Sequence, residues 1–159
     1  MTEIHLIPKP VKMHAMPGGF IFSAACKLVA KGEAAGIARR WVESLLPALN
    51  FNLKIIFNEG TEPGMLHFKL DPDLSLLGSE GYRLEVTPER IIISAFEPAG
   101  LFYGGQTLKQ LMPDGIFGAL KIGLDQFGIP CVEIEDRPRF TWRGAMLDVC
   151  RHFMPKEFV

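Results

Sequence analysis

The chain has 159 residues, 48% of them hydrophobic, and its 17 Lys and Arg residues nearly balance 18 Asp and Glu residues. This length and composition predict one domain with a hydrophobic core, with or without a short tail. The near-neutral charge argues against a nucleic-acid partner, and the apolar runs are far shorter than the roughly 20 residues that a membrane span needs. The first residues also lack the basic and apolar regions of a signal peptide, although a chain whose signal had been removed would look the same.

The first half of the chain predicts short strands around one amphipathic helix. Two prolines keep residues 7–11 extended. Residues 33–46 place apolar side chains at three- and four-residue spacing, which predicts a helix that ends at Pro47. Apolar runs bounded by turn residues predict four short strands, at 19–22, 27–30, 53–57 and 65–70.

The next segments predict a hairpin and a second helix. Residues 81–87 alternate between apolar and polar side chains, and a Pro-Glu-Arg turn leads to the apolar run 91–95. A helix is expected from Pro98 to about Met112. Its internal Gly-Gly pair, 104–105, costs about 1 kcal/mol per glycine relative to alanine, which indicates close packing against the sheet.

The last third predicts a strand, a linker and a final apolar strand. Residues 129–135 are expected as an edge or connecting strand, followed by a polar Asp-Arg-Pro-Arg linker and the apolar strand 144–149. Strands, helix, strands, helix and strand in this order predict an α+β fold, with a mixed sheet and two helices packed on one face.

The sequence offers few candidates for chemistry. The histidines His5, His14, His67 and His152 lie far apart without a His-Glu-x-x-His pair, so no metal site is predicted. No glycine-rich phosphate loop and no Gly-flanked nucleophilic serine is present. A catalytic pair of Cys150 and His152 is disfavoured because residues two apart at a strand end need not touch.

The cysteines and carboxylates have simple structural interpretations. Cys26, Cys131 and Cys150 are spaced like neither a zinc site nor a redox pair and are expected to be small buried side chains; a disulfide between two of them stays open. Glu133, Glu135 and Asp136 are expected to be solvated charges on an exposed connector. Asp148 interrupts an apolar strand, and a salt bridge or backbone hydrogen bond is favoured over a catalytic role.

Several stretches resemble one known family. Residues 134–153, Ile-Glu-Asp-Arg-Pro-Arg-Phe-Thr-Trp-Arg-Gly-Ala-Met-Leu-Asp-Val-Cys-Arg-His-Phe, closely resemble the start of the catalytic barrel of family 20 glycoside hydrolases, the β-N-acetylhexosaminidases. Residues 7–11 (Ile-Pro-Lys-Pro-Val) and the stretch from Gly81-Tyr-Arg-Leu-Glu-Val to Gly100-Leu-Phe-Tyr-Gly-Gly-Gln-Thr-Leu-Lys-Gln-Leu111 resemble the N-terminal domain of that family. The resemblance covers nearly the whole chain, and its barrel motif is highly specific.

The resemblance implies a domain organisation and one site residue. Residues 1–136 would form the N-terminal α+β accessory domain, zincin-like but without zinc or any cofactor, with Trp41 in its core. Residues 137–159 would be the linker and the truncated first strand of a (β/α)₈ barrel, which needs roughly 250 residues. Arg151 follows that strand, at the end where such barrels hold their active sites, and would bind hydroxyls of the terminal sugar. Pairing of Arg151 with an acid such as Asp148 is the structural alternative, and Trp142 would lie at the barrel base or interface.

The implied activity is hydrolysis of terminal N-acetylglucosamine or N-acetylgalactosamine with retention of configuration. In the family, the substrate's acetamido oxygen attacks the anomeric carbon, a glutamic acid protonates the leaving oxygen, and the preceding aspartate orients the acetamido group. This chain contains no Asp-Glu dipeptide, so it is expected to be an inactive fragment whose missing barrel is its intramolecular partner. Family members are expected in the periplasm or secreted; the sequence decides neither the compartment nor the preferred sugar linkage.

Two alternatives remain. The chain could be a free-standing structural or interaction module whose exposed tail docks onto a partner. It could also be a carbohydrate-binding module, which is disfavoured because the phenylalanines are expected to face inward. An uncovered strand at 144–149 would expose an unpaired edge, so residues beyond about Phe140 are expected to be disordered or held by a neighbouring chain.

Overall fold

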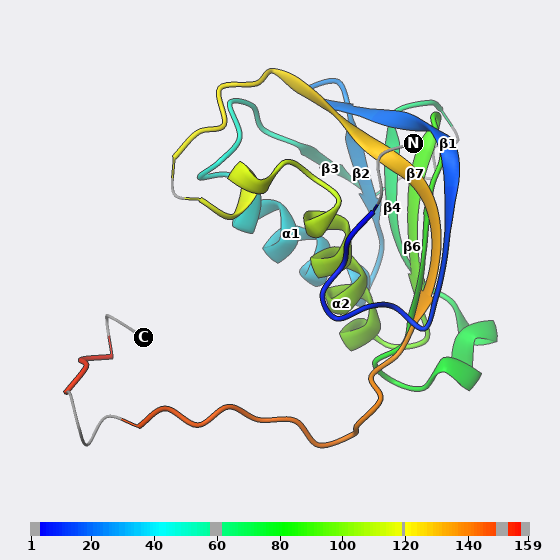
Figure 1. Ribbon diagram of the computed structural model, residues 1–159. Helices are drawn as coiled ribbons and strands as arrows, with labels where there is room; N and C mark the ends of the chain where they lie inside the picture. Colours follow the sequence, from blue (N-terminus) through cyan, green and yellow to red (C-terminus); the bar gives the residue numbers. More distant parts are fainter. Residues whose placement is uncertain (1–3, 58–61, 119, 149–152, 157–159) are drawn as a thin grey trace.

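A computed structural model describes residues 4–57, 62–118, 120–148 and 153–156 (Figure 1). In chain order, its strands, α-helices and short 3₁₀ helices (η) are β1 (Lys12–Ser23), β2 (Lys27–Ala30), α1 (Glu33–Leu45), β3 (Lys54–Ile56), β4 (Met65–Leu70), η1 (Pro72–Leu77), β5 (Tyr82–Val86), β6 (Arg90–Ala95), α2 (Pro98–Gln110), η2 (Asp114–Phe117) and β7 (Gln126–Asp136). The predicted helices and the hairpin of β5 and β6 are confirmed, with helix ends displaced by one or two residues.

The strands form one mixed sheet in the order β1-β7-β5-β6-β4-β2-β3. Strands β3, β2, β4 and β6 run parallel to one another, whereas β5 pairs antiparallel with β6 and β7, and β7 pairs antiparallel with β1. The strand predicted at 129–135 is confirmed as β7, but an edge position for it is wrong, because β7 is hydrogen-bonded on both sides. The outer positions belong to β1 and β3.

Both α-helices cover the same face of the sheet (Figure 1). The buried side of α1 carries the predicted apolar residues Ala34, Ile37, Ala38, Trp41, Val42 and Leu45. Trp41 lies between the two helices, where its Nε1 donates a hydrogen bond of 2.8 Å to the Gly105 carbonyl oxygen. These contacts confirm the α+β fold and the place of Trp41 in the core.

Glycines let α2 approach its neighbours closely, as the sequence predicts. A Cβ atom added at Gly104 would lie 2.5 Å from Ile93 Cγ2 of β6. A Cβ atom at Gly105 would lie 2.8 Å from Trp41 Cδ1, so the second glycine faces α1 rather than the sheet.

Strand β1 is much longer than predicted, and only its last part, 19–22, was expected. Its pairing with β7 shifts register between Ala15 and Gly19. Within this bulge, Gly18 has a φ of 98°, a value that favours glycine. The Pro-Gly-Gly sequence therefore marks a bulge inside the strand.

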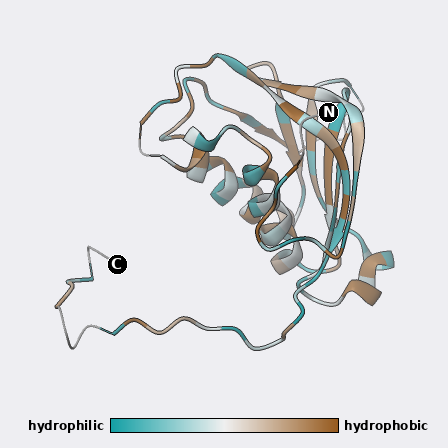
Figure 2. Cartoon of the chain, in the orientation of Figure 1, coloured by the Kyte–Doolittle hydropathy of each residue, from teal (hydrophilic) through white to brown (hydrophobic). Residues whose placement is uncertain are grey.

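The phenylalanines do not mostly face inward, and that prediction is wrong. Phe20, Phe22, Phe68 and Phe127 are buried in the core. A larger group is exposed: Phe57, Phe96, Phe102, Phe117, Phe140 and Phe153. Exposed apolar residues also occur on η1, which projects from the sheet and is partly brown in Figure 2.

Residues 137–148 leave β7 as a linker on the helix side of the sheet and run beneath α2 in Figure 1. Residues 144–148 form no strand, and Val149 lies outside the described residues, so the barrel strand stays a prediction. Trp142 is 87% exposed. Within the described ranges, neither α-helix combines the length and apolar character that a membrane crossing requires.

Candidate functional site

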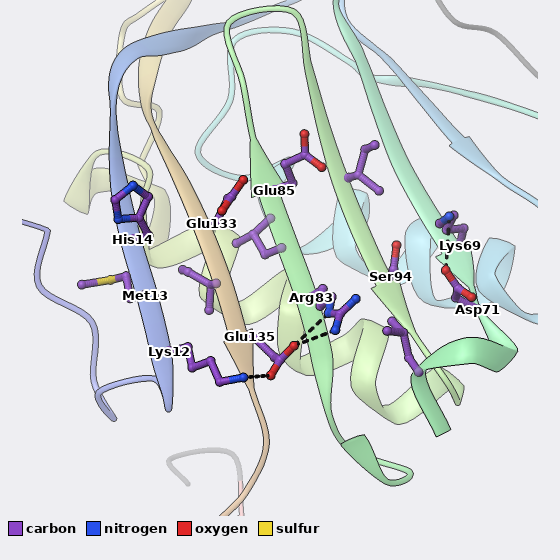
Figure 3. Close-up of a pocket in the computed structure, with 14 residues that line it drawn as sticks. Lys12, Met13, His14, Lys69, Asp71, Arg83, Glu85, Ser94, Glu133 and Glu135 are labelled. Atoms are coloured by element: carbon purple, nitrogen blue, oxygen red, sulfur yellow. Dashed lines mark hydrogen bonds and ion pairs between the residues drawn. The ribbon is translucent and has the colours of Figure 1, made fainter. Parts of the chain in front are cut away.

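The sheet face opposite the helices carries rows of polar side chains across its strands (Figure 3). Glu135 of β7 lies opposite Lys12 of β1 and Arg83 of β5. Lys12 Nζ donates to Glu135 Oε1 at 2.7 Å, and Arg83 Nε donates to Oε2 at 2.9 Å. These hydrogen bonds lower the pKa of Glu135. Glu135 therefore joins three strands, and its prediction as a solvated charge on a connector is wrong.

A second row on this face places His14 opposite Glu133, and Glu133 opposite Glu85. The hollow over both rows has a volume of about 560 Å³. Within the described parts of the chain, no three His, Cys, Asp or Glu side chains converge as metal ligands would. Glu133 and Glu85 lie opposite each other on neighbouring strands and both line this hollow (Figure 3). The hydrogen-bonded row of Lys12, Glu135 and Arg83 supports the register of the three strands.

Asp136, the last residue of β7, joins the chain's N-terminal segment to the core. Its Oδ1 accepts a hydrogen bond of 3.0 Å from the Val11 amide, and its Oδ2 accepts one of 3.4 Å from the Tyr82 hydroxyl. That hydroxyl also shares a hydrogen bond of 2.5 Å with Thr107 Oγ1 of α2. Burial, together with the nearby charge of Asp136, raises the pKa of Tyr82. The prediction that Asp136 is a solvated charge on an exposed connector is therefore also wrong.

A pocket of about 610 Å³ lies between α2, the N-terminal segment and the linker. We call it the linker pocket; its lining includes Lys9, Glu80, Tyr103, Gln106, Phe140 and Arg143. Gln110 closes one end, because its side chain accepts a hydrogen bond from the Ile7 amide and donates one to the Ile7 carbonyl, both at 2.9 Å. The N-terminal segment is thus fixed along α2.

Arg143 fastens the linker at the other end of this pocket. Its guanidinium donates two hydrogen bonds to the Glu80 carboxylate, at 2.7 and 3.1 Å, and one to the Tyr103 hydroxyl at 3.0 Å. The Tyr103 hydroxyl in turn donates to Glu80 Oε1 at 3.1 Å. The hydrogen bonds from Arg143 lower the pKa of Glu80 and raise that of Arg143. Because the Arg143 guanidinium binds both oxygens of the Glu80 carboxylate, its orientation is fixed as well as its position.

Lys109, the charged residue of α2, is buried between the helices at 8% exposure. Its Nζ donates to Ser44 Oγ at 3.4 Å and lies 5.2 Å from the centre of the Phe117 ring. Burial lowers the pKa of this lysine. Among the described residues, no carboxylate lies within ion-pair distance of it.

Some of the site residues predicted from the sequence lie in the described part of the structure, and others do not. Arg151, Cys150 and His152 lie outside the described residues, so the sugar-binding role of Arg151 stays a prediction. Cys26 and Cys131 are buried thiols, as predicted, and they do not form a disulfide with each other; burial raises the pKa of both.

Sequence reasoning missed the residues of the linker pocket. Tyr103 belongs to the Gly-Leu-Phe-Tyr-Gly-Gly stretch that carries the family resemblance, but nothing in its spacing indicates a partner. Glu80 and Arg143 are separated by 63 residues, and no sequence pattern pairs them.

The described residues thus form a mixed sheet backed by two helices, with the segment after β7 fastened to α2. The family model described as glycosyl hydrolase family 20, domain 2, matches residues 3–137, and the chain therefore belongs to this family.

Relatives and solved structures agree with this assignment. The chain is 32% identical over 156 residues to a β-N-acetylhexosaminidase of Cellulomonas fimi. This alignment covers 96% of this chain and 30% of the relative. It is also 32% identical to a β-hexosaminidase of Porphyromonas gingivalis, over 97% of this chain and 20% of the relative. The solved β-hexosaminidase of Streptomyces plicatus superposes with a TM-score of 0.74 at 30% identity, over 91% of this chain and 28% of that one. For an exo-β-N-acetylglucosaminidase of Vibrio harveyi, the TM-score is 0.75 at 29% identity, over 94% of this chain and 21% of that one.

The chain spans 20 to 30% of the length of these two relatives. The match covers one domain of family 20 glycoside hydrolases.

Proposed function

We propose that this chain is the N-terminal supporting domain of a β-N-acetylhexosaminidase. The observation that carries the proposal is the match of the family 20 domain over residues 3–137, with similarity to a β-N-acetylhexosaminidase that continues through the linker. The whole protein would hydrolyse terminal N-acetylglucosamine or N-acetylgalactosamine residues of glycans. The domain itself would hold the following barrel in place and take no part in bond cleavage.

The proposed chemistry belongs to the missing barrel. In substrate-assisted catalysis, the acetamido oxygen of the sugar is the nucleophile, a carboxylic acid protonates the leaving oxygen, and an aspartate orients the acetamido group. The chain has no Asp-Glu pair for the last two tasks. We therefore expect the 159-residue chain alone to be inactive.

Sequencing the coding DNA beyond Val159 tests the proposal. We expect an open frame of about 250 further codons, enough for the rest of a barrel, and an Asp-Glu pair within it. A stop codon directly after Val159 would contradict the proposal and favour a free-standing interaction module.

Within that longer protein, Arg151 is the residue of this chain that we propose to bind substrate. Its guanidinium offers several donors in a fixed plane, which suits neighbouring sugar hydroxyls. Hydrogen bonds to a charged group contribute about 1.5–3 kcal/mol, so we expect Arg151→Ala to lower kcat/KM for an aryl N-acetylglucosaminide by roughly 10- to 100-fold. Arg151→Lys should restore part of the loss.

Arg39→Ala is the matched control, because Arg39 is an exposed arginine of α1, away from the linker. It should leave kcat/KM unchanged. An Arg151→Ala enzyme with normal kcat/KM would show that Arg151 does not contact the sugar, without affecting the assignment of the domain.

A further inference from the structure

The open sheet face brings two glutamates directly opposite each other. Glu133 of β7 and Glu85 of β5 are partners in the antiparallel pairing of these strands. Side chains at such positions share one face with Cβ atoms about 4.5–5.5 Å apart, and like charges there destabilise a sheet. Among the described residues, none forms a hydrogen bond or an ion pair with either carboxylate, including His14, which lies opposite Glu133 on β1.

The neighbouring row of side chains shows how the same strands pair a charge. Two residues further along β7, Glu135 accepts hydrogen bonds from Lys12 and from Arg83. Strand β7 therefore carries one glutamate that is paired from both sides and one that no described residue neutralises. Local conflicts of this kind occur in natural folds mainly at functional sites, so the row of Glu85 and Glu133 is a candidate binding site.

A buried hydroxyl lines the same hollow (Figure 3). Ser94 of β6 lies opposite Arg83 of β5, which places its side chain on the open face, and it is only 7% exposed. Within the described part of the chain, its hydroxyl has no hydrogen-bond partner. Buried hydroxyls are normally hydrogen-bonded, so this one is free to bind a group that enters the hollow.

The charges of the hollow favour a cation. Its lining includes three Lys and Arg side chains and four carboxylates: Lys12, Lys69, Arg83, Asp71, Glu85, Glu133 and Glu135. All three of the basic side chains form ion pairs with Glu135 or Asp71, which leaves the charge of the other two glutamates in excess. Among the described residues, no three side chains converge as metal ligands would. An ammonium group, which two carboxylates can satisfy through hydrogen bonds, therefore fits better than a metal ion that needs six or more oxygens.

The position of Ser94 indicates that the ligand also carries hydroxyls. Ser94 pairs with Arg83, two residues from Glu85 along β5, so it lies about 7 Å from the row of glutamates. An ammonium ion alone cannot reach from the glutamates to Ser94, whereas a molecule the size of a sugar can. The hollow, with a volume of about 560 Å³, has the size of a small-molecule site.

We propose that the hollow on the open sheet face binds an amino sugar with a free, protonated amine. Its ammonium group lies between Glu85 and Glu133, and a hydroxyl of the sugar hydrogen-bonds to Ser94. The choice of an amino sugar among hydroxylated amines rests on the proposed function, since a hexosaminidase acts on glycans that contain this sugar in acetylated form. The nitrogen of an acetylated sugar is an uncharged amide, so the two carboxylates distinguish the free amine from it.

NMR titration of the isotope-labelled 159-residue chain with D-glucosamine tests the site. At about pH 6.5, where an amine of this kind is protonated, the amide signals of Glu85, Ser94 and Glu133 should shift. N-acetylglucosamine should bind at least about tenfold more weakly, because it lacks the charged donor. We expect weaker binding of 2-aminoethanol as well, since it is too short to reach Ser94, and no displacement of glucosamine by calcium.

Variants separate a binding role of the glutamates from a structural one. Glu85→Gln and Glu133→Gln should each weaken glucosamine binding by at least about tenfold, and Ser94→Ala by a smaller factor. Both Gln variants should also unfold at higher urea concentrations than the wild type, because each removes the repulsion between like charges. Glu43→Gln is the matched control, since Glu43 is an exposed carboxylate of α1 on the other side of the sheet. It should change neither binding nor stability.

Four results would overturn this site: equal affinity for glucosamine and N-acetylglucosamine, equal affinity for 2-aminoethanol, displacement of glucosamine by calcium, or lower stability of both Gln variants. The last result would show that the two glutamates serve the fold.

Activity separates this inference from the function on which the choice of sugar rests. An extended protein that hydrolyses 4-nitrophenyl N-acetyl-β-D-glucosaminide, with a domain that does not distinguish the two sugars, retains the proposed function and loses the site. A domain that distinguishes them, in an extended protein that hydrolyses no such substrate, retains the site and loses the proposed function.

Discussion

Single side chains hold the two segments that flank the sheet against α2. Gln110 binds both the amide and the carbonyl of Ile7, and Arg143 binds Glu80 and Tyr103. Both contacts lie at the linker pocket, and both join residues far apart in sequence. Local patterns carry no information on such contacts, which is why Arg143 was not recognised from the sequence while the buried Trp41 was.

At the residue scale, His67 of β4 also leads to a prediction of how the free energy of unfolding depends on pH. Burial lowers its pKa below the ordinary 6.5, and the positive charges of Arg90 and Lys69 lower it further. The folded chain therefore holds this proton more weakly than the unfolded chain. The free energy of unfolding should consequently fall as pH drops from about 6.5 through the lowered pKa. We expect His67→Gln to flatten the pH dependence over this window.

NMR titration of His67 measures the shift directly. Its ring should titrate below 6.5, and Arg90→Gln should move the midpoint upward by removing one repulsive charge. Titration of the wild-type ring at or above 6.5 would contradict this account of its surroundings.

At the scale of elements, helices and strands with a strong periodic pattern could be predicted from the sequence, whereas the pairing of strands could not. The three-and-four spacing of α1 and the alternation of β5 predicted both elements to within a residue or two. The first part of strand β1 was not predicted, because Pro17 and Gly18 interrupt its pattern at the bulge. The interior place of β7 depends on pairing with β1 and β5, which lie more than 40 residues away along the chain and follow no local rule.

Glycines in the two helices give a matched prediction for stability. A Cβ at Gly104 of α2 would lie 2.5 Å from Ile93 Cγ2 and 3.1 Å from Tyr82 Cδ2, both in the core. We expect Gly104→Ala to destabilise the domain by about 1–3 kcal/mol, since overpacking outweighs the gain in helix propensity. A Cβ at Gly36 of α1 would meet no atom within 4 Å, so Gly36→Ala should stabilise by about 0.5–1 kcal/mol.

Urea unfolding of both variants measures the difference. Similar stabilisation by the two substitutions would show that α2 can move away from the sheet, and that its glycines are not required for packing.

At the scale of the whole molecule, the two broad faces of the domain differ in character. The open sheet face carries paired charges suited to water. On the opposite side, α1 has charged residues at its exposed positions, whereas α2, beside the fastened linker, has none at its exposed positions. The family and fold were predictable because motifs at both ends of the domain resemble family 20. The difference between the exposed positions of α1 and α2 could not be predicted from the sequence, because it depends on which side chains stay uncovered once the helices have packed on the sheet.

The supporting role of this domain is tested most directly by hydrolysis of 4-nitrophenyl N-acetyl-β-D-glucosaminide, measured for the 159-residue chain and for the chain extended by its continuing coding sequence. We predict turnover by the extended protein and no turnover above buffer by the 159-residue chain, which has no Asp-Glu pair. Turnover by the 159-residue chain that survives repurification and Arg151→Ala would contradict the account, because the domain would then contain a catalytic centre of its own.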